Sequence, residues 1–190
     1  MTTRRGADPG SGDRAFLSVG SNLGPEENVS AALGLLLATP GVEITGISTF
    51  YWTPPLAAPG APADSVAGDP DFLNGVLEIQ TSLAPEALVE ALGIIEVALG
   101  RVPSEDKYAP RTLDLDLLLC ESHPHPPHQD IRTRPWVALP LLELAPDLRL
   151  PPDGISLADV ARAFTGPGGR ADEALTRRLR RSFLPEDPTS

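Results

Sequence analysis

The chain has 190 residues, a formal net charge of −11 and a single cysteine. This length predicts one compact domain, no apolar run reaches the ~18 residues of a membrane span, and one cysteine excludes an internal disulfide. The acidic balance argues against broad nucleic-acid binding, because counterion release needs a basic face. We therefore expect a cytoplasmic monomer with no membrane or nucleic-acid partner.

The N-terminal half predicts a strand, a helix and a second strand. Residues 1–13 are expected to be a disordered lead-in, because no apolar stretch follows Arg4-Arg5 as an export signal requires. A strand at 15–19 ends in the turn-rich run 20–24, which we interpret as a plain strand-to-helix turn. A helix then begins at Pro25, and its apolar positions share one face: Val29, Ala32, Leu33, Leu36 and Leu37. The second strand covers 42–53.

The following segments complete a repeated strand and helix pattern. Residues 57–71 hold mostly Ala, Gly, Pro, Ser and Asp, and are a candidate lid. A strand at 72–81, a helix from Pro85 to the cap at Gly100 and a strand at 112–120 come next. The order β-α-β-β-α-β predicts an α+β fold of the ferredoxin-like type, with helices packed on one face of an antiparallel sheet.

The C-terminal part predicts shorter helices near 139–144 and 156–164, the second with Ser156 as its N-cap. We place the domain at residues 14–168. Residues 169–190 are rich in Arg and are expected to form a tail, a frayed amphipathic helix followed by disorder.

The run Arg111-Thr112-Leu113-Asp114-Leu115-Asp116 is the most informative motif. Side chains alternate along a strand, so both carboxylates share one face with Cα atoms ~6.5–7 Å apart. Such a pair favours a cation, and Mg²⁺ accepts one or two carboxylates together with phosphate oxygens. Arg101 and Arg111 flank the pair and suit phosphate. An exposed edge strand is the alternative for the two aspartates taken alone.

Two further clusters have a structural and a functional interpretation. The aromatic and amide residues at 51–56, 72–74 and 136 could hold a flat heteroaromatic ligand or could form part of the core. Cys120, His123, His125 and His128 could bind zinc, but their spacing fits no standard zinc module and three prolines stiffen the segment. Solvated loop histidines are the favoured interpretation there.

Together these motifs resemble the 6-hydroxymethyl-7,8-dihydropterin pyrophosphokinase family of the folate pathway. The matching runs occur in family order over about residues 15–151: 19–24, 51–56, 72–74, Glu96, 100–101, 110–116, 127–128, 134–136 and 140–141. The resemblance implies a ferredoxin-like fold and transfer of pyrophosphate from ATP to the pterin hydroxymethyl group, with AMP as the other product.

The resemblance also implies roles for single residues. Asp114 and Asp116 would hold two Mg²⁺ ions and, with Arg101 and Arg111, form the catalytic set. The residues that would meet ATP are Glu96, Arg101, Arg111, Leu117, His128 and Arg134. The residues that would bind the pterin are Thr53, Pro54, Leu56, Phe72, Asn74 and Trp136.

The chain departs from the family pattern beside the carboxylates. Pro103 and Ser104 stand where relatives usually present basic residues, Lys107 could compensate, and Gln129 follows His128. These departures leave an alternative open, a ferredoxin-like module that binds pterin or nucleotide and has lost efficient catalysis.

Overall fold

One antiparallel sheet organises the protein. The computed structural model describes residues 12–57, 60–102, 110–121, 126–166 and 168–185. In the main sheet the strand order is β5 (Asp114–Cys120), β1 (Asp13–Ser21), β4 (Phe72–Thr81), β3 (Tyr51–Thr53) and β8 (Arg170–Ala171), and β2 (Val42–Ile47) also pairs with β4. Every pairing in this sheet is antiparallel. The predicted ferredoxin-like order is confirmed.

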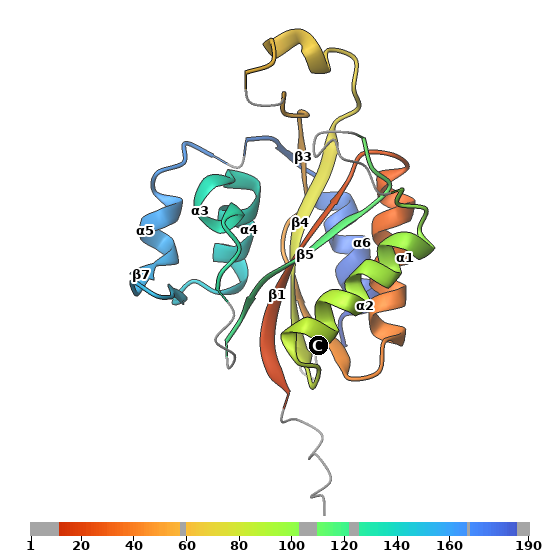
Figure 1. Cartoon of the computed structure of the whole chain (residues 1–190), viewed down its shortest axis with the longest axis vertical. Helices are drawn as coiled ribbons and strands as arrows, with labels where there is room; N and C mark the ends of the chain where they lie inside the picture. The colour runs from red at the N-terminus through yellow and green to blue at the C-terminus, as the bar shows by residue number, and fades with distance from the viewer. Residues whose placement is uncertain (1–11, 58–59, 103–109, 122–125, 167, 186–190) are drawn as a thin grey trace, which may run out of the picture.

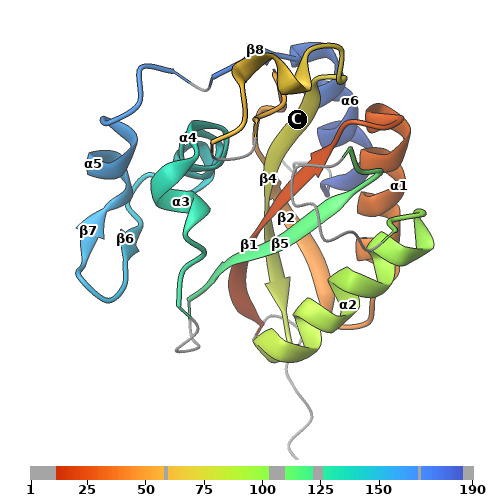
Figure 2. The same cartoon turned by 45° about the horizontal axis from the view of Figure 1, so that its top comes forward.

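Helices cover both faces of the sheet (Figures 1 and 2). On one face lie α1 (Pro25–Ala38), α2 (Pro85–Ala98) and α6 (Glu173–Phe183); on the other lie α3 (Asp130–Thr133), α4 (Pro135–Leu144) and α5 (Leu157–Ala161). Each face has its own apolar core. The expectation that helices cover one face was too simple, because α3 to α5 bury the second face.

The helix boundaries follow local sequence signals. Pro25 and Pro85 occupy the first turn of their helices, where the missing N–H costs nothing. Gly100 has a φ of 82° just past α2, a conformation that favours glycine. Ser156 caps α5 as predicted, since its side chain accepts a hydrogen bond from the Asp159 N–H. Leu37 departs from the predicted apolar face and is 42% exposed.

The predicted strand at 42–53 is interrupted. β2 ends at Ile47 and β3 begins at Tyr51. Between them the Ser48 N–H donates to the Val76 carbonyl at 3.0 Å, and the Ser48 hydroxyl accepts the Val76 N–H at 2.8 Å. A side chain thus replaces one backbone rung, so the chain turns there instead of continuing as one strand.

Both predicted domain boundaries need correction within the described residues. β1 begins at Asp13, which pairs with Thr81, so the last residue of the predicted lead-in at 1–13 belongs to the sheet. At the other end, β8 pairs with β3, and α6 buries Leu175, Thr176 and Leu179 against the core. Residues 170–183 therefore belong to the packed domain, because their apolar face has a sheet to cover.

The remaining elements are short. A 3₁₀ turn, η1 (Ala63–Val66), lies in the long connection between β3 and β4, which projects from one end of the sheet in Figure 1. A two-stranded ribbon, β6 (Arg149–Leu150) with β7 (Ile155–Ser156), precedes α5. The long connection retains its interpretation as a candidate lid.

Candidate active site

Strand β5 presents its two aspartates on one face, as the alternation predicts. Leu113, Leu115 and Leu117 are at most 5% exposed and belong to the core on the α1, α2 and α6 side. Asp114 and Asp116 occupy the alternate positions and are half-buried. Since alternate side chains point to opposite faces, the two carboxylates open toward the side of the sheet that carries α3 and α4.

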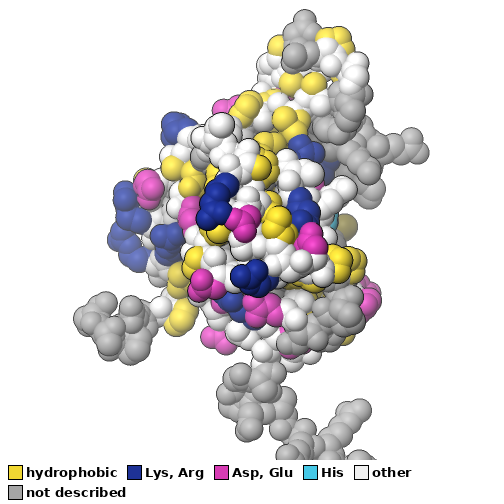
Figure 3. Space-filling model, turned by 90° about the vertical axis from the view of Figure 1, so that its left-hand side faces the viewer, with side chains coloured by type: hydrophobic (Ala, Val, Ile, Leu, Met, Phe, Trp, Pro, Cys, Tyr) yellow, Lys and Arg dark blue, Asp and Glu magenta, His cyan; other side chains and the backbone are white. Residues whose placement is uncertain are grey.

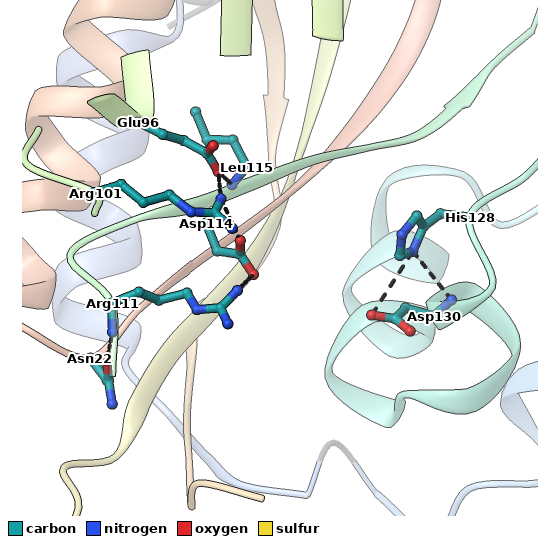
Figure 4. Close-up of polar contacts among 8 residues, drawn as sticks. All are labelled: Asn22, Glu96, Arg101, Arg111, Asp114, Leu115, His128 and Asp130. Atoms are coloured by element: carbon teal, nitrogen blue, oxygen red, sulfur yellow. Dashed lines mark hydrogen bonds and ion pairs between the residues drawn. The ribbon is translucent and has the colours of Figure 1, made fainter. Parts of the chain in front are cut away.

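Asp114 lies between two guanidinium groups (Figure 4). The Arg101 Nη1 atom is 2.8 Å from Asp114 Oδ1, and Arg111 Nη1 donates to Asp114 Oδ2 at 3.0 Å. Arg101 follows the end of α2, and Arg111 precedes β5. The structure thus brings the predicted arginines and carboxylate together, although Arg101 and Asp114 are far apart in the sequence.

Glu96 links α2 to β5. Its side chain is 11% exposed, and its Oε1 atom accepts the Leu115 N–H at 2.7 Å and forms an ion pair with Arg101. Burial raises the pKa of Glu96, although the Leu115 N–H and Arg101 favour the ionised form. This carboxylate therefore fixes the start of β5 and the direction of Arg101.

Asp116 is the electrostatically unfavourable member of the pair. Burial raises the pKa of Asp116, and the negative charge of Asp114 raises it further. A proton or a cation at this position would relieve both effects. Within the described segments no group of three or more His, Cys, Asp or Glu side chains is placed to hold a metal, but Mg²⁺ needs only one or two carboxylates when phosphate supplies further oxygens.

Asn22 is a site residue that the sequence interpretation missed. Its side chain accepts the Arg111 N–H at 2.8 Å and donates to the Pro70 carbonyl at 3.3 Å, while its own N–H donates to the Arg111 carbonyl at 3.2 Å. Gly24 at the helix start has a φ of 56°. The run 20–24 is the predicted turn, but its asparagine also holds the backbone that carries Arg111.

Asn74 lies in the same row of the sheet as Asp114. In register, Asp114 faces Gly20 on β1, Gly20 faces Asn74 on β4, and Asn74 faces Tyr51 on β3. A Cβ on Gly20 would lie 2.9 Å from the Asn74 side-chain oxygen. The absence of a side chain at Gly20 therefore lets the Asn74 amide lie across β1, toward the carboxylates.

The edge beside Asn74 is formed by β3 and its continuation. Asn74 Nδ2 donates to the buried Thr53 hydroxyl at 2.8 Å. Pro54 and Leu56 follow the strand and are exposed, Leu56 to 39%. Thr53 and Asn74 are in contact, whereas the contributions of Pro54 and Leu56 to a ligand site stay predictions.

The aromatic residues divide between the two interpretations. Tyr51 and Trp52 are half-buried with their polar atoms satisfied: Tyr51 donates to Glu143 Oε1 at 2.8 Å and Trp52 donates to Asp172 Oδ2 at 2.9 Å. Burial and the Glu143 hydrogen bond raise the pKa of Tyr51 to about 12. Phe72 begins β4 and is half-buried, and so is Trp136 in the first turn of α4. Tyr51 and Trp52 are thus structural, and a pair of Phe72 and Trp136 stays a prediction.

The other predicted ATP residues differ in position. The Leu117 side chain is buried in the core on the face opposite the carboxylates, and its contact with ATP stays a prediction. The His128 Nδ1 atom lies 3.9 Å from Asp130 Oδ2, and in Figure 4 the imidazole lies across from the arginines. Arg134 stacks over the Trp136 ring at 5.4 Å and lies 3.8 Å from Asp130.

The zinc alternative has no support among the described residues. Cys120 is 1% exposed and packs in the core. His123 and His125 lie outside the described residues. Pro103, Ser104 and Lys107 also lie outside them, so the effects expected from the departures at those positions stay predictions.

Two further observations concern the helices and the surface of the described residues. In the described segments no helix is both long and apolar enough to cross a membrane. The face shown in Figure 3 carries acidic and basic side chains interspersed with one another.

Comparison with known proteins identifies relatives over most of the chain. The family described as 7,8-dihydro-6-hydroxymethylpterin-pyrophosphokinase matches residues 16–146. A 2-amino-4-hydroxy-6-hydroxymethyldihydropteridine pyrophosphokinase from Pseudomonas aeruginosa is 40% identical over 157 residues, which cover 79% of this chain and 91% of the relative. A relative of the same name from Methylorubrum extorquens is 39% identical over 145 residues, which cover 71% of this chain and 84% of the relative. The folic acid synthesis protein fol1 of Schizosaccharomyces pombe is 36% identical over 70% of this chain, but that match covers 18% of the longer protein.

Proposed function

The chain belongs to the 7,8-dihydro-6-hydroxymethylpterin-pyrophosphokinase family, and we propose that it transfers pyrophosphate from ATP to the hydroxymethyl oxygen of 6-hydroxymethyl-7,8-dihydropterin in folate biosynthesis. One observation carries the assignment of the site: both Arg101 and Arg111 contact Asp114, beside a second carboxylate on the same face. We further propose that the protein acts as a cytoplasmic monomer.

The arginines are the proposed phosphate ligands. Arg101 and Arg111 both form ion pairs with Asp114. Phosphate oxygens offer guanidinium groups an equivalent planar partner, so ATP can take the place of Asp114 on both arginines. We assign the further ATP contacts to Glu96, His128, Arg134 and the backbone of Leu117.

Asp114 and Asp116 are the proposed holders of two Mg²⁺ ions. The raised pKa of Asp116, caused by burial and by Asp114, fits a site that a cation completes. The bound metal would neutralise charge on the transferring group and orient it. Exchange of Arg101 and Arg111 onto phosphate leaves both Asp114 oxygens open for this role.

The pterin is proposed to lie between Phe72 and Trp136. Its flat ring matches aromatic faces, and the Asn74 amide offers both a donor and an acceptor to its amide-like edge. Thr53 fixes this amide through the 2.8 Å hydrogen bond. We place Pro54 and Leu56 at the same edge, where the chain leaves β3.

The proposed reaction needs alignment more than covalent help from the protein. The hydroxymethyl oxygen attacks the β-phosphorus, the bond from that phosphorus to the α,β-bridging oxygen breaks, and AMP leaves with the bridging oxygen. The alcohol proton passes to phosphate or water. Arg101 and Arg111 are placed to stabilise charge on the phosphate oxygens, a contribution that dominates phosphoryl transfer.

A product assay tests this proposal. Purified protein is incubated with Mg²⁺, ATP and 6-hydroxymethyl-7,8-dihydropterin, and AMP is separated from ADP. Pterin-dependent AMP formation is expected, and Asp114→Ala is expected to abolish turnover while pterin affinity changes little. Folded protein that binds pterin without forming AMP would instead support the catalytically weak binding module.

A further inference from the structure

The C-terminal residues 168–183, here termed the C-terminal clasp, pack beside the proposed pterin pocket. The clasp comprises β8, α6 and the two glycines before them, and it lies beyond the segment 16–146 that matches the family. Neither the proposed reaction nor the predicted site residues assign it a role. It contacts β3 directly, and β3 is the strand that carries Thr53.

Backbone pairing fixes the clasp to β3. In register, Ala171 faces Tyr51 and Arg170 faces Trp52. The Asp172 N–H then donates to the Phe50 carbonyl at 2.8 Å. β3 therefore has β4 on one side and the clasp on the other, although it is only three residues long.

Asp172 adds a side-chain connection. One carboxylate oxygen accepts the Leu175 N–H at 3.0 Å and caps α6, and the other accepts the Trp52 indole N–H at 2.9 Å. These hydrogen bonds lower the pKa of Asp172, the Leu175 contact more than the Trp52 contact. A single carboxylate thus ties the start of α6 to the residue that precedes Thr53.

The two glycines bring the clasp against the walls of the pocket. A Cβ on Gly169 would lie 2.1 Å from the Trp52 carbonyl oxygen and 2.8 Å from Thr53 Cγ2. A Cβ on Gly168 would lie 3.5 Å from the Trp136 ring. The clasp therefore touches both Thr53 and Trp136, which we place at the edge and on the face of the pterin.

We propose that Asp172 is a positioning residue for the pterin substrate. It fixes Trp52, which sets the position of Thr53 and so directs the Asn74 amide. The inference rests on the proposed function for the identity of the substrate. It adds that the substrate pocket is completed by a segment outside the family match.

The test separates the two hydrogen bonds of Asp172. Asp172→Ser keeps an N-cap for α6, because serine caps as well as aspartate, but it is too short to reach the Trp52 indole. Trp52→Phe removes the indole donor and keeps the cap. Ser156→Ala is the matched control, since it removes the N-cap of α5, which lies in the other helical layer.

Steady-state kinetics give the main result. Asp172→Ser and Trp52→Phe are each expected to raise the KM for the pterin about tenfold, with kcat and the KM for ATP changed less than twofold. The double variant is expected to be no worse than either single variant, because both remove the same hydrogen bond. Ser156→Ala is expected to lower thermal stability and leave the pterin KM unchanged. An unchanged pterin KM in Asp172→Ser and Trp52→Phe would reduce the contact to a structural one and overturn the proposal.

Direct binding distinguishes this inference from the proposed function. Calorimetric titration with 6-hydroxymethyl-7,8-dihydropterin is expected to give a Kd about tenfold weaker in Asp172→Ser than in the wild type. If the wild type binds pterin but forms no AMP, the proposed reaction fails while this Kd ratio still decides the positioning role. Equal Kd values, or no pterin binding by the wild type, would overturn the inference.

Discussion

Replacement of Asp116 by asparagine is expected to stabilise the ligand-free protein while abolishing turnover. Asp116 is half-buried, and its carboxylate shares one face of β5 with that of Asp114. At ~7 Å and an effective dielectric constant of about 20, two such charges repel by about 2 kcal/mol. Arg101 and Arg111 offset part of this repulsion, which leaves a net gain of about 1 kcal/mol, or ~2–4 °C in Tm.

Asp114→Asn provides the matched comparison with the opposite sign. Asp114 is the carboxylate that both arginines contact, and these three side chains are between 18% and 29% exposed. Loss of its charge relieves the same repulsion with Asp116, but it also weakens two charge-assisted contacts and leaves two guanidinium groups close together, and we expect these losses to be larger. We expect a loss of about 1–2 kcal/mol in the free energy of unfolding and, as for Asp116→Asn, no AMP formation.

The assay is thermal and denaturant unfolding in EDTA without nucleotide, followed across pH. Because the folded pKa of Asp116 is raised above its ordinary value of 3.8, the folded state holds more protons than the unfolded state between those two pKa values. The contribution of Asp116 to the free energy of unfolding of the wild type therefore falls as the pH rises between those two pKa values. The advantage of Asp116→Asn should appear above about pH 3.8 and be complete above the folded pKa. Shifts of the same sign in both variants, or an advantage independent of pH, would refute the reasoning.

Two further substitutions test how the site is supported. Gly20→Ala places a Cβ 2.9 Å from the Asn74 side-chain oxygen. This variant should raise the KM for pterin about tenfold with little change in the KM for ATP. Equal changes in both KM values would contradict a local effect on Asn74. Asn22→Ala removes the acceptor of the Arg111 N–H. It should lower the free energy of unfolding by about 1–3 kcal/mol and raise the KM for ATP more than the KM for pterin. Denaturant unfolding and steady-state kinetics measure these effects, and an unchanged KM for ATP would argue against a role of Asn22 in placing Arg111.

The sequence allowed the β5 motif and the element order to be predicted because both depend on local periodicity. Alternation along one strand suffices to place Asp114 and Asp116 on a common face. The break at Ser48 was missed, because a hydroxyl that replaces a backbone rung leaves no mark in the pattern of apolar residues. Asn22 was missed for a related reason, since its partners Arg111 and Pro70 are far away in the chain.

The C-terminal segment shows the limit of composition as evidence. Its many arginines suggested a frayed tail, yet Leu175 and Leu179 are at most 2% exposed and face the core. The arginines occupy the opposite, exposed positions, and Arg180 donates to the Ile47 carbonyl at 2.8 Å. Burial of a narrow apolar stripe against a sheet, which composition does not report, therefore decides that this helix belongs to the domain.

The contacts of Asp114 predict that cation and nucleotide bind cooperatively. A cation alone must displace Arg101 and Arg111 from the carboxylate, and phosphate alone must draw the same arginines away from Asp114. When both are present, each displaced charge gains a new partner, so the cost of breaking the ion pairs is met once instead of twice. A coupling of 1–3 kcal/mol, typical of linked sites, corresponds to a change in affinity of about 5–150-fold.

Calorimetric titration with Mg²⁺ tests this coupling. Binding to the free protein should be weak, and binding to the protein saturated with a nonhydrolysable ATP analogue should be at least about tenfold tighter, after correction for Mg²⁺ bound by the free analogue. Linkage requires the same factor in the affinity for the analogue with and without Mg²⁺, and Asp114→Asn should reduce it, since the carboxylate that the arginines release is then absent. Independent binding of the two ligands would show that the ion pairs of Asp114 do not oppose either one.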